Sequence, residues 1–439
     1  MEINRNQLLT VLSESLDCVE KEVLGVTDHH AKRVAWLCIQ MGKFAGMDEK
    51  EISDMAVAAL LHDNALNEFR LDYENKKPRP GVSGKNHCIA GEKNLHFIPG
   101  CEDMRGFVLY HHECADGSGP FEKTQEETPL GAQIIHLADE VDLHFPLGSY
   151  DAVLHESIFS YVEANVETLF SKQVADLLLH VLEQAALEQI SNENIDLLTL
   201  EILPVWIPVD KGIAELFAQI IDYKSSFTKT HSIGVAQNAA IMAKHYGYDE
   251  EKTNKLYMAG ALHDIGKVFV HNDVLEKPGR LDEKEYQYIQ SHAFETYRLL
   301  SKIDGLSDVC DWASFHHEKL NGKGYPFGKN ANELDHEMRL LACLDIYQAL
   351  TENRPYKAGM NHGRAMSILA ELVEKGELDK DIVRDMDIVL ADGKNDTEEI
   401  ETALFQCAVC GYIFEGDVVP YEYACPVCGQ PEHNFTRIK

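Results

Sequence analysis

Residues 257–267 read YMAGALHDIGK and place adjacent His263 and Asp264 at the end of an apolar run. Residues 56–66 read AVAALLHDNAL and place His62 and Asp63 in the same apolar frame. Adjacent residues on a helix point about 100° apart. Both members of such a pair can therefore reach one cavity in two directions, and each pair is a candidate for metal binding.

The two HD pairs belong to a pattern that occurs twice along the 439-residue chain. The first copy consists of His30, His62 and Asp63, His87, His111 and His112, and Asp139. The second copy consists of His231, His263 and Asp264, His292, His316 and His317, and Asp345. The offset between the copies is 201, 205 or 206 residues, which indicates a duplicated unit. We therefore predict two similar domains, at 1–200 and 201–400, with a boundary near Pro204 and Pro208.

The segments between these positions predict helices. Residues 172–190 and 364–378 place apolar side chains at i, i+3, i+4 and i+7, and alternation typical of strands is scarce before residue 400. We predict an all-α fold of tandem helical domains. Residues 401–439 contain two CxxC pairs and few helix signals, so they predict a small, separate module held by a metal.

Composition excludes several classes of partner. Lys plus Arg is 40 against 73 Asp plus Glu, a net charge of −33 that would repel long nucleic acids and anionic membranes. The N-terminal sequence has no signal-peptide pattern, and no run of 18 apolar residues predicts a membrane span. Most cysteines are scattered, as in a reducing compartment. We expect a cytoplasmic protein.

The second copy of the pattern offers seven ligands with nitrogen and oxygen donors, enough for two metal ions with open positions. Neutral imidazole and carboxylate suit Fe, Mn, Zn or Ni. Two metals about 3.5–4 Å apart can bind a shared hydroxide and a phosphate oxygen. The pattern therefore predicts hydrolysis of a phosphodiester.

The second half resembles an HD-GYP domain, a subgroup of the HD metal-dependent phosphohydrolases. The resemblance rests on HDIGK (263–267), HHEKLNGKGYP (316–326) and LDIYQALTENRPYK (344–357). It implies a helical domain with a di- or tri-metal centre, usually of iron or manganese. It also implies hydrolysis of 3′,5′-cyclic dinucleotides, chiefly cyclic di-GMP, to the linear pGpG, to GMP or to both. Cyclic GMP-AMP is the alternative substrate.

The resemblance also implies roles for individual residues. Asp264 bridges the two metals, and Lys267 contacts the scissile phosphate or helps to protonate the leaving oxygen. The ligands of one metal are His231, His263 and Asp345, and those of the other are His292, His316 and His317. The residues expected beside the substrate are Gly322, Gly324, Tyr325 and Pro326 in one loop, with Arg354 and Lys357 on the phosphates.

Two positions depart from the family pattern. Members with a third metal have a glutamate four residues before the first histidine, where this chain has Phe227. We therefore predict a dinuclear centre. Many members also have a second aspartate three residues after the last ligand, where this chain has Gln348. That substitution puts in doubt a contact that would orient a ligand.

The first half resembles a degenerate HD domain. It keeps all seven candidate ligands, but Leu66 stands where the second half has Lys267. It has no tyrosine before Pro120, and nothing like RPYK follows Asp139. We expect this half to be regulatory or structural, either with its own metal or retained only for packing.

The C-terminal cysteines resemble those of the rubredoxin-like module that ends rubrerythrins. The four thiolates are Cys407, Cys410, Cys425 and Cys428, which suit one Fe or Zn. A purely structural zinc ribbon is the alternative. We hypothesise that an iron-loaded module passes electrons to the second-half centre, so that hydrolysis depends on redox state.

Two other functions are alternatives to a phosphodiesterase. A redox sensor could bind a cyclic dinucleotide with little turnover, but Lys267, Arg354 and Lys357 favour turnover. A peroxide-reducing protein of the rubrerythrin kind is disfavoured, because such sites use Glu-x-x-His ligation in a four-helix bundle. The sequence therefore predicts a metal-dependent cyclic dinucleotide phosphodiesterase.

Overall fold

The computed structural model describes residues 2–23, 28–65, 84–95, 97–101, 104, 106–149, 152–184, 187–195, 198–208, 211–224, 231–275, 277, 279–352, 359–391, 404–407, 413–415 and 435–437. Two compact units are present, Met1–Arg384 and Asp385–Lys439. The first unit contains both copies of the histidine pattern. None of the described helices is long and apolar enough to cross a membrane.

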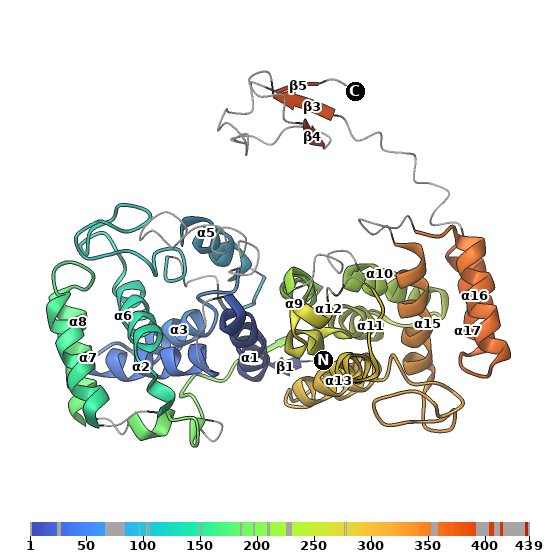
Figure 1. Ribbon diagram of the computed structural model, residues 1–439, viewed down its shortest axis with the longest axis horizontal. Coiled ribbons are helices and arrows are strands. Elements are labelled where there is room, and N and C mark those ends of the chain that lie inside the picture. The colour runs from blue at the N-terminus through green and yellow to red at the C-terminus, as the bar shows by residue number, and fades with distance from the viewer. Residues whose placement is uncertain are drawn as a thin grey trace. The chain divides into compact units, whose positions relative to one another are not determined.

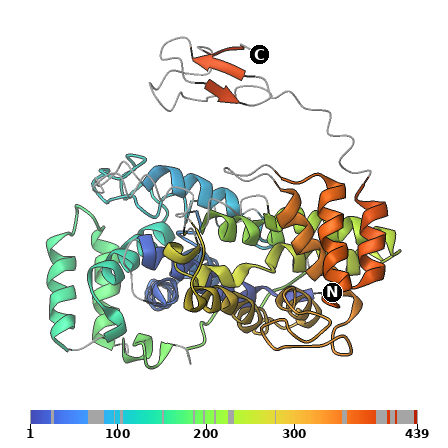
Figure 2. The same ribbon diagram turned by 45° about the vertical axis from the view of Figure 1, so that its right-hand side comes forward.

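Helices dominate the first unit, which confirms the predicted all-α class (Figures 1 and 2). Those of the first half are α1 (Arg5–Val23), α2 (His30–Phe44), α3 (Glu49–Leu60), α5 (Gly84–Leu95), α6 (Leu130–His144), α7 (Ala152–Ala164) and α8 (Lys172–Gln184). Those from residue 211 onward are α9 (Lys211–Lys224), α10 (His231–His245), α11 (Glu250–Leu262), α12 (Asn272–Leu275), α13 (Glu283–Leu300), α14 (Ser307–Ser314), α15 (His336–Thr351), α16 (His362–Glu374) and α17 (Lys380–Val389). The short 3₁₀ helix η5 (Ile265–Phe269) follows the second HD pair.

Equivalent local signals start the helices that carry the two HD pairs. Asp48 caps α3 by accepting the backbone N–H of Glu51, and Asp249 caps α11 by accepting that of Lys252. Such a cap satisfies a backbone donor at the first turn, where the helix itself offers no acceptor. The two caps are 201 residues apart, as are the HD pairs. Each pair therefore stands at the C-terminal end of a helix of nearly the same length.

Equivalent helices also pack together in the two halves. α2 packs on α3 and α6, and α10 packs on α11 and α15. Small buried residues allow the close approach: a Cβ at Gly260 of α11 would lie 2.8 Å from the Cα of Ala236 in α10. This packing brings the C-terminal end of α11 beside the N-terminal end of α10, where His231 lies.

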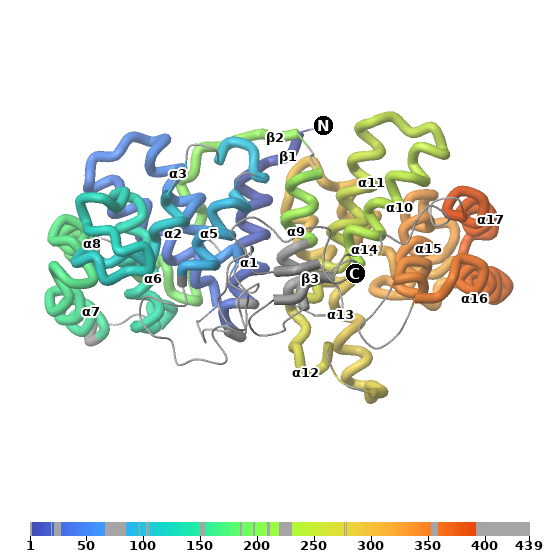
Figure 3. Tube along the Cα trace, turned by 90° about the horizontal axis from the view of Figure 1, so that it is seen from above, coloured from blue at the N-terminus to red at the C-terminus, as the bar shows by residue number. Residues whose placement is uncertain are grey.

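Helix α1 connects the two halves of the first unit. It packs on α2 and α3 of the first half and on α9 and η5 of the second, and it lies between the two groups of helices in Figures 1 and 3. Glu14 of α1 forms ion pairs with Arg298 at 2.7 Å and Lys302 at 2.6 Å. The preceding strand β1 (Glu2–Asn4) pairs antiparallel with β2 (Trp206–Pro208), with Ile3 opposite Ile207.

In the second unit, the described residues beyond 391 form three short strands. β3 (Leu404–Cys407) lies between β4 (Ile413–Glu415) and β5 (Phe435–Arg437), and both neighbours are antiparallel to it. Cys407 is the last residue of β3. Cys410, Cys425 and Cys428 lie outside the described residues. The domain limits near residues 200 and 400 remain our proposal.

The backbone after the second HD pair leaves no room at Gly266, where an added Cβ would overlap the carbonyl oxygen of His292 in α13. We expect Gly266→Ala to lower the free energy of unfolding by about 2–3 kcal/mol, because rigid backbone must move. Gly363, whose Cβ would meet nothing within 4 Å, is the matched control. Gly363→Ala should change stability by less than about 1 kcal/mol. Urea unfolding followed by circular dichroism measures both, and equal effects would contradict this packing.

Candidate metal centres

The seven predicted ligands of the second half meet at one buried place. His231 begins α10, His263 and Asp264 follow α11, and Asp345 lies in α15. His292 comes from α13, and the adjacent His316 and His317 follow α14. Six of them form two groups, and within each group the ligand atoms lie within 4.8 Å of one another. One group is His231, His263 and Asp264, and the other is His292, His316 and His317.

Asp264 lies between the two groups. Its Oδ2 is 3.1 Å from Nε2 of His263, and its Oδ1 is 3.4 Å from Nε2 of His292 and 4.0 Å from Nε2 of His316. Asp345 approaches the first group, with Oδ1 3.0 Å from Nε2 of His231. One carboxylate that faces both histidine groups fits the predicted bridging role.

Backbone hydrogen bonds fix which ring nitrogen of the histidines faces the centre. Nδ1 of His263 donates to the carbonyl of Gly260, and Nδ1 of His316 donates to that of Ala313. His292 donates in the same way to Ile289. A carbonyl can only accept, so Nδ1 carries the proton and Nε2 keeps its lone pair toward the centre. These rings are oriented as metal ligands.

The charge balance of the second-half centre fits a cation. Burial lowers the pKa of His292 to about 3 and that of His317 to about 4, so both rings are neutral at pH 7. Burial alone would raise the pKa of the Asp264 carboxyl, but the neighbouring His263 and Lys267 outweigh it and hold that pKa well below the usual range. The buried Nε2 of His263 has no hydrogen-bond partner among the described residues. Burial alone would lower the pKa of His231, but Asp345 and Glu352 outweigh it and raise that pKa to about 10, so a metal bound there would displace a proton. Neutral imidazoles beside ionised carboxylates suit divalent metals.

Glu352, which the sequence analysis did not identify, makes the ligand-orienting contact that Gln348 had put in doubt. Its Oε2 lies 3.1 Å from Nδ1 of His231 and so takes the place of the expected aspartate, from one turn further along the chain. Gln348 instead accepts a hydrogen bond from Asn238 at 3.1 Å. The orienting contact on His231 is therefore present, through a different residue.

The predicted substrate residues lie at the edge of the same centre where they are described. Nζ of Lys267 lies 2.5 Å from Oδ2 of Asp264. The ring of Tyr325 lies 4.7 Å from that of His317, and its N–H donates to the His317 carbonyl. A Cβ at Gly324 would lie 2.5 Å from the Cα of Glu318, so only glycine fits there. Arg354, Lys357 and Phe227 lie outside the described residues.

The glutamate of each HHE triplet holds the loop that follows it. Glu318 accepts the backbone N–H groups of Phe327 at 2.7 Å and Lys329 at 2.9 Å. Glu113 accepts those of Phe121 and Lys123, both at 2.6 Å. These buried carboxylates therefore fix the shape of the two loops. The sequence analysis assigned them no role.

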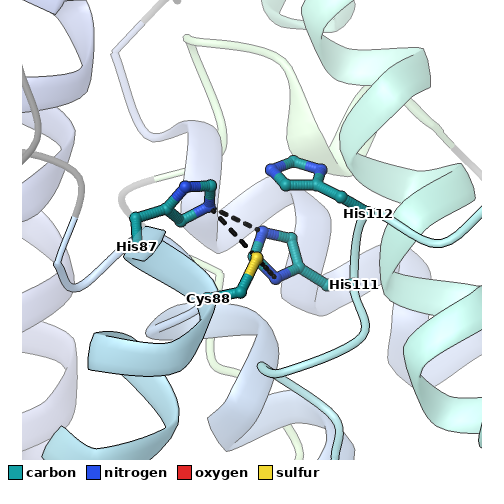
Figure 4. Close-up of side chains that lie close together, drawn as sticks. All are labelled: His87, Cys88, His111 and His112. Atoms are coloured by element: carbon teal, nitrogen blue, oxygen red, sulfur yellow. Dashed lines mark hydrogen bonds between the residues drawn. The ribbon is translucent and has the colours of Figure 1, made fainter. Parts of the chain in front are cut away.

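The first half brings together the same seven positions. His30, His62 and Asp139 form one group, and His87, His111 and His112 form another that also contains Cys88 (Figure 4). Asp63 faces the second group, with Oδ1 3.3 Å from Nε2 of His87 and 3.6 Å from Nε2 of His111. The buried Nε2 atoms of His30 and His62 have no hydrogen-bond partner among the described residues. This donor set also fits divalent metals. Leu66 lies outside the described residues.

Two further acidic side chains of the first half were missed by sequence reasoning. Asp142 accepts Nε of Arg33 at 2.6 Å and Nη2 at 2.9 Å, and it contacts Nδ1 of His30 at 2.7 Å. In the second half Gly234 stands at the position of Arg33 and Gln348 at that of Asp142, and these two residues pack together. Glu20 of α1 is buried, and burial raises its pKa to about 8.

Cys88 is the remaining difference between the halves. It is buried beside His87 and His111, where the second half has buried Ala293. Burial alone would raise the pKa of the thiol, but the neighbouring His111 and His87 outweigh it and lower the pKa to about 6. No motif marked Cys88 in the sequence. Alignment of the two copies of the histidine pattern would have shown it opposite Ala293.

Comparisons with known proteins agree with this arrangement. Residues 27–143 and 215–382 match HD domain families, and residues 405–436 match the rubrerythrin rubredoxin-like domain. The chain is 30% identical over 398 residues to the 3′3′-cGAMP-specific phosphodiesterase 1 of Vibrio cholerae, covering 87% of this chain and 90% of that relative. The chain belongs to the HD-GYP family of phosphodiesterases. The predicted family and the predicted C-terminal module are confirmed.

A second relative and a solved structure are also similar to this HD-GYP protein. It is 33% identical over 159 residues to a cyclic di-GMP phosphodiesterase of Pseudomonas aeruginosa, covering 36% of this chain and 38% of the relative. The crystal structure of a V. cholerae cyclic GMP-AMP-specific phosphodiesterase shares the fold, with a TM-score of 0.61 and 22% identity over 91% of this chain and 99% of that chain. Family membership supports metal-dependent hydrolysis of a cyclic dinucleotide.

Removal of Glu352 should weaken metal binding, because His231 would lose the acceptor that fixes its ring. We expect Glu352→Ala to raise the dissociation constant for Mn²⁺ by about 10–100-fold. The measurement is a Mn²⁺ titration in a His62→Ala/Asp63→Ala background, which silences the first half. Gln348→Ala, which removes no contact to His231, is the control. An unchanged constant in Glu352→Ala would contradict the orienting role.

Removal of Asp142 should destabilise the first half. Asp142→Ala would leave the guanidinium of Arg33, which is fully buried, without its paired carboxylate. We expect a loss of about 3–5 kcal/mol in the free energy of unfolding. The control is Asp176→Ala, which breaks the exposed pair with Lys172 and should cost about 0.5 kcal/mol or less. Urea titrations compare the two, and a small effect of Asp142→Ala would show that Arg33 finds other compensation.

Proposed function

We propose that the second half hydrolyses one 3′,5′-phosphodiester bond of a cyclic dinucleotide. The observation that carries the proposal is the position of Asp264, whose two oxygens face the two histidine groups. His231, His263 and Asp345 would hold one metal, and His292, His316 and His317 the other. Two bound divalent metals supply a nucleophilic hydroxide and bind a phosphate oxygen. Iron and manganese are the metals we favour.

Lys267 is the described cation placed to act on the phosphate. Its ammonium lies beside Asp264 at the edge of the centre and is partly exposed. With metals bound to Asp264, its negative charge would be shared with them, and the Lys267 ammonium would be available to a phosphate oxygen. In a chain with a net charge of −33, a local cation is needed to receive a dianionic ligand. We assign Lys267 to binding the scissile phosphate or protonating the leaving oxygen.

The loop 322–326 would form the wall beside the substrate. Gly324 has no space for a side chain, and the ring of Tyr325 lies against that of His317 at a tilt of 39°. The loop is held by Glu318, so Tyr325 has a fixed position before any ligand binds. We propose that Gly324, Tyr325 and Pro326 contact the substrate, with Arg354 and Lys357 on its phosphates.

Cyclic di-GMP and 3′3′-cGAMP are the two candidate substrates. Sequence motifs favoured cyclic di-GMP, with pGpG or GMP as product. The relative that matches both halves of the chain is specific for 3′3′-cGAMP, whereas the cyclic di-GMP phosphodiesterase from Pseudomonas matches about a third of it. We therefore expect faster turnover of 3′3′-cGAMP.

The first half and the C-terminal module would not take part in the chemical step. The first half has the ligands of a metal centre but no counterpart of Lys267, so we propose that it is a regulatory or structural metal domain. The C-terminal module would bind one metal through Cys407, Cys410, Cys425 and Cys428. Electron transfer from this module stays a prediction.

Loss of the Lys267 ammonium should slow turnover without removing metal. We expect Lys267→Met to lower kcat by about 10²–10³-fold, the size of effect seen when one donor to a developing negative charge is removed. Lys244→Met, on an exposed surface of α10, is the control. Anaerobic assays with metal-loaded protein and both cyclic dinucleotides, followed by chromatography, measure the rates. Binding without turnover of either substrate in the unsubstituted protein would favour the sensor function instead.

A further inference from the structure

Cys88 points into a group of three histidines in the first half (Figure 4). It follows His87 on α5, and His111 and His112 come from the segment before α6. Its Sγ lies 3.6 Å from Nε2 of His87 and 3.7 Å from Nδ1 of His111. Cys88, His87 and His111 are fully buried. Its sulfur therefore lies within reach of a metal that these three imidazoles could bind.

The ligand atoms of this group lie within 4.8 Å of one another, and two of their separations match those of ligands around one metal. In a tetrahedral site with metal–nitrogen bonds of about 2.05 Å and a metal–sulfur bond of about 2.3 Å, two nitrogens lie about 3.3 Å apart and nitrogen and sulfur about 3.6 Å. Here Nε2 of His87 lies 3.4 Å from Nε2 of His111, and Sγ of Cys88 lies 3.6 Å from Nε2 of His87. Nδ1 of His111, which is the ring nitrogen 3.7 Å from Sγ of Cys88, donates to the carbonyl of Val108. Nε2 of His111, which faces His87, is therefore the nitrogen that can bind a metal.

We propose that Cys88, as a thiolate, is a ligand of a metal site formed with His87, His111 and His112. The thiol proton is released to solvent when the metal binds. A thiolate with three imidazoles selects Zn²⁺, Fe²⁺ or Co²⁺ over the hard cations Mg²⁺, Ca²⁺ and Mn²⁺. Asp63 approaches His87 and His111 from the other group of ligands.

The thiolate makes this site different in kind from the one in the second half. The equivalent residue there is Ala293, whose methyl group cannot coordinate, so a metal held by His292, His316 and His317 would keep a position for water or substrate. In the first half Cys88 fills it. Closed sites with protein ligands at every position are typical of structural metals, whereas open sites are catalytic. The proposal therefore gives a chemical reason why the first half holds a metal without hydrolysing a phosphodiester, and it does not depend on the activity of the second half.

Cadmium-113 NMR of the full chain tests the proposal directly, because the shift reports how many sulfurs bind the metal. We expect a resonance at an intermediate shift, from one sulfur and several nitrogens, separate from those of the four-thiolate module and of the nitrogen–oxygen centre in the second half. Cys88→Ala, which copies Ala293, should abolish or move only that resonance. The same variant should weaken Zn²⁺ binding to the first half by at least tenfold.

Two results would overturn the proposal. One is a spectrum of the unsubstituted protein in which the first half is loaded and no resonance beyond the four-thiolate one shows sulfur ligation. The other is a Cys88→Ala spectrum identical to that of the parent. If Cys88→Ala fails to fold, Cys88→Ser replaces it, and the spectrum of the unsubstituted protein still decides. Unchanged resonances of the other metal sites in the variant show that the rest of the chain is intact.

Discussion

The structure of the second half depends on one buried carboxylate. Asp264 follows the last turn of α11 and faces imidazoles from three directions, from α11 itself, from α13 and from the segment after α14. A charged carboxylate without cations would be costly to bury there. The surrounding rings keep their lone pairs toward it because their protons are bonded to backbone carbonyls. Helix packing, loop shape and the small residues at Gly260 and Gly266 all serve to hold these donors around Asp264.

The two halves show how one scaffold can support two kinds of centre. Both keep an aspartate between two histidine groups, and both hold the following loop with a buried glutamate. They differ in what surrounds the ligands. His30 is held by Asp142, which is paired with buried Arg33, whereas His231 is held by Glu352. Lys267 and Tyr325 stand at the edge of the second centre, and Cys88 stands inside the first. The two centres therefore share seven positions and differ in the neighbours of those positions, with Cys88 as an added candidate ligand in the first half.

The ligands were predictable from sequence, and their neighbours were not. The duplicated spacing of the HD and HHE motifs identified the seven candidate ligands of each half but not Cys88, and the helical periodicity between them predicted the fold. Glu352, Asp142 and Arg33 escaped because their roles depend on which helices pack together, and nothing in a local pattern encodes that. Gln348 predicted a lost contact, but a residue one helical turn later supplies it. Helix α1 packs on both halves, pairs with the second half through Glu14 and carries buried Glu20. Its role likewise appears only in three dimensions.

The most direct test of the account compares the two HD pairs in one assay. Metal-loaded protein, His263→Ala/Asp264→Ala and His62→Ala/Asp63→Ala would be incubated anaerobically with 3′3′-cGAMP and with cyclic di-GMP, and the linear products separated by chromatography. The account predicts that the substitutions in the second half abolish hydrolysis, and that those in the first half leave the catalytic step in place even if its rate changes. Hydrolysis that survives the loss of His263 and Asp264, or that requires His62 and Asp63 while the metals of the second half remain bound, would contradict it.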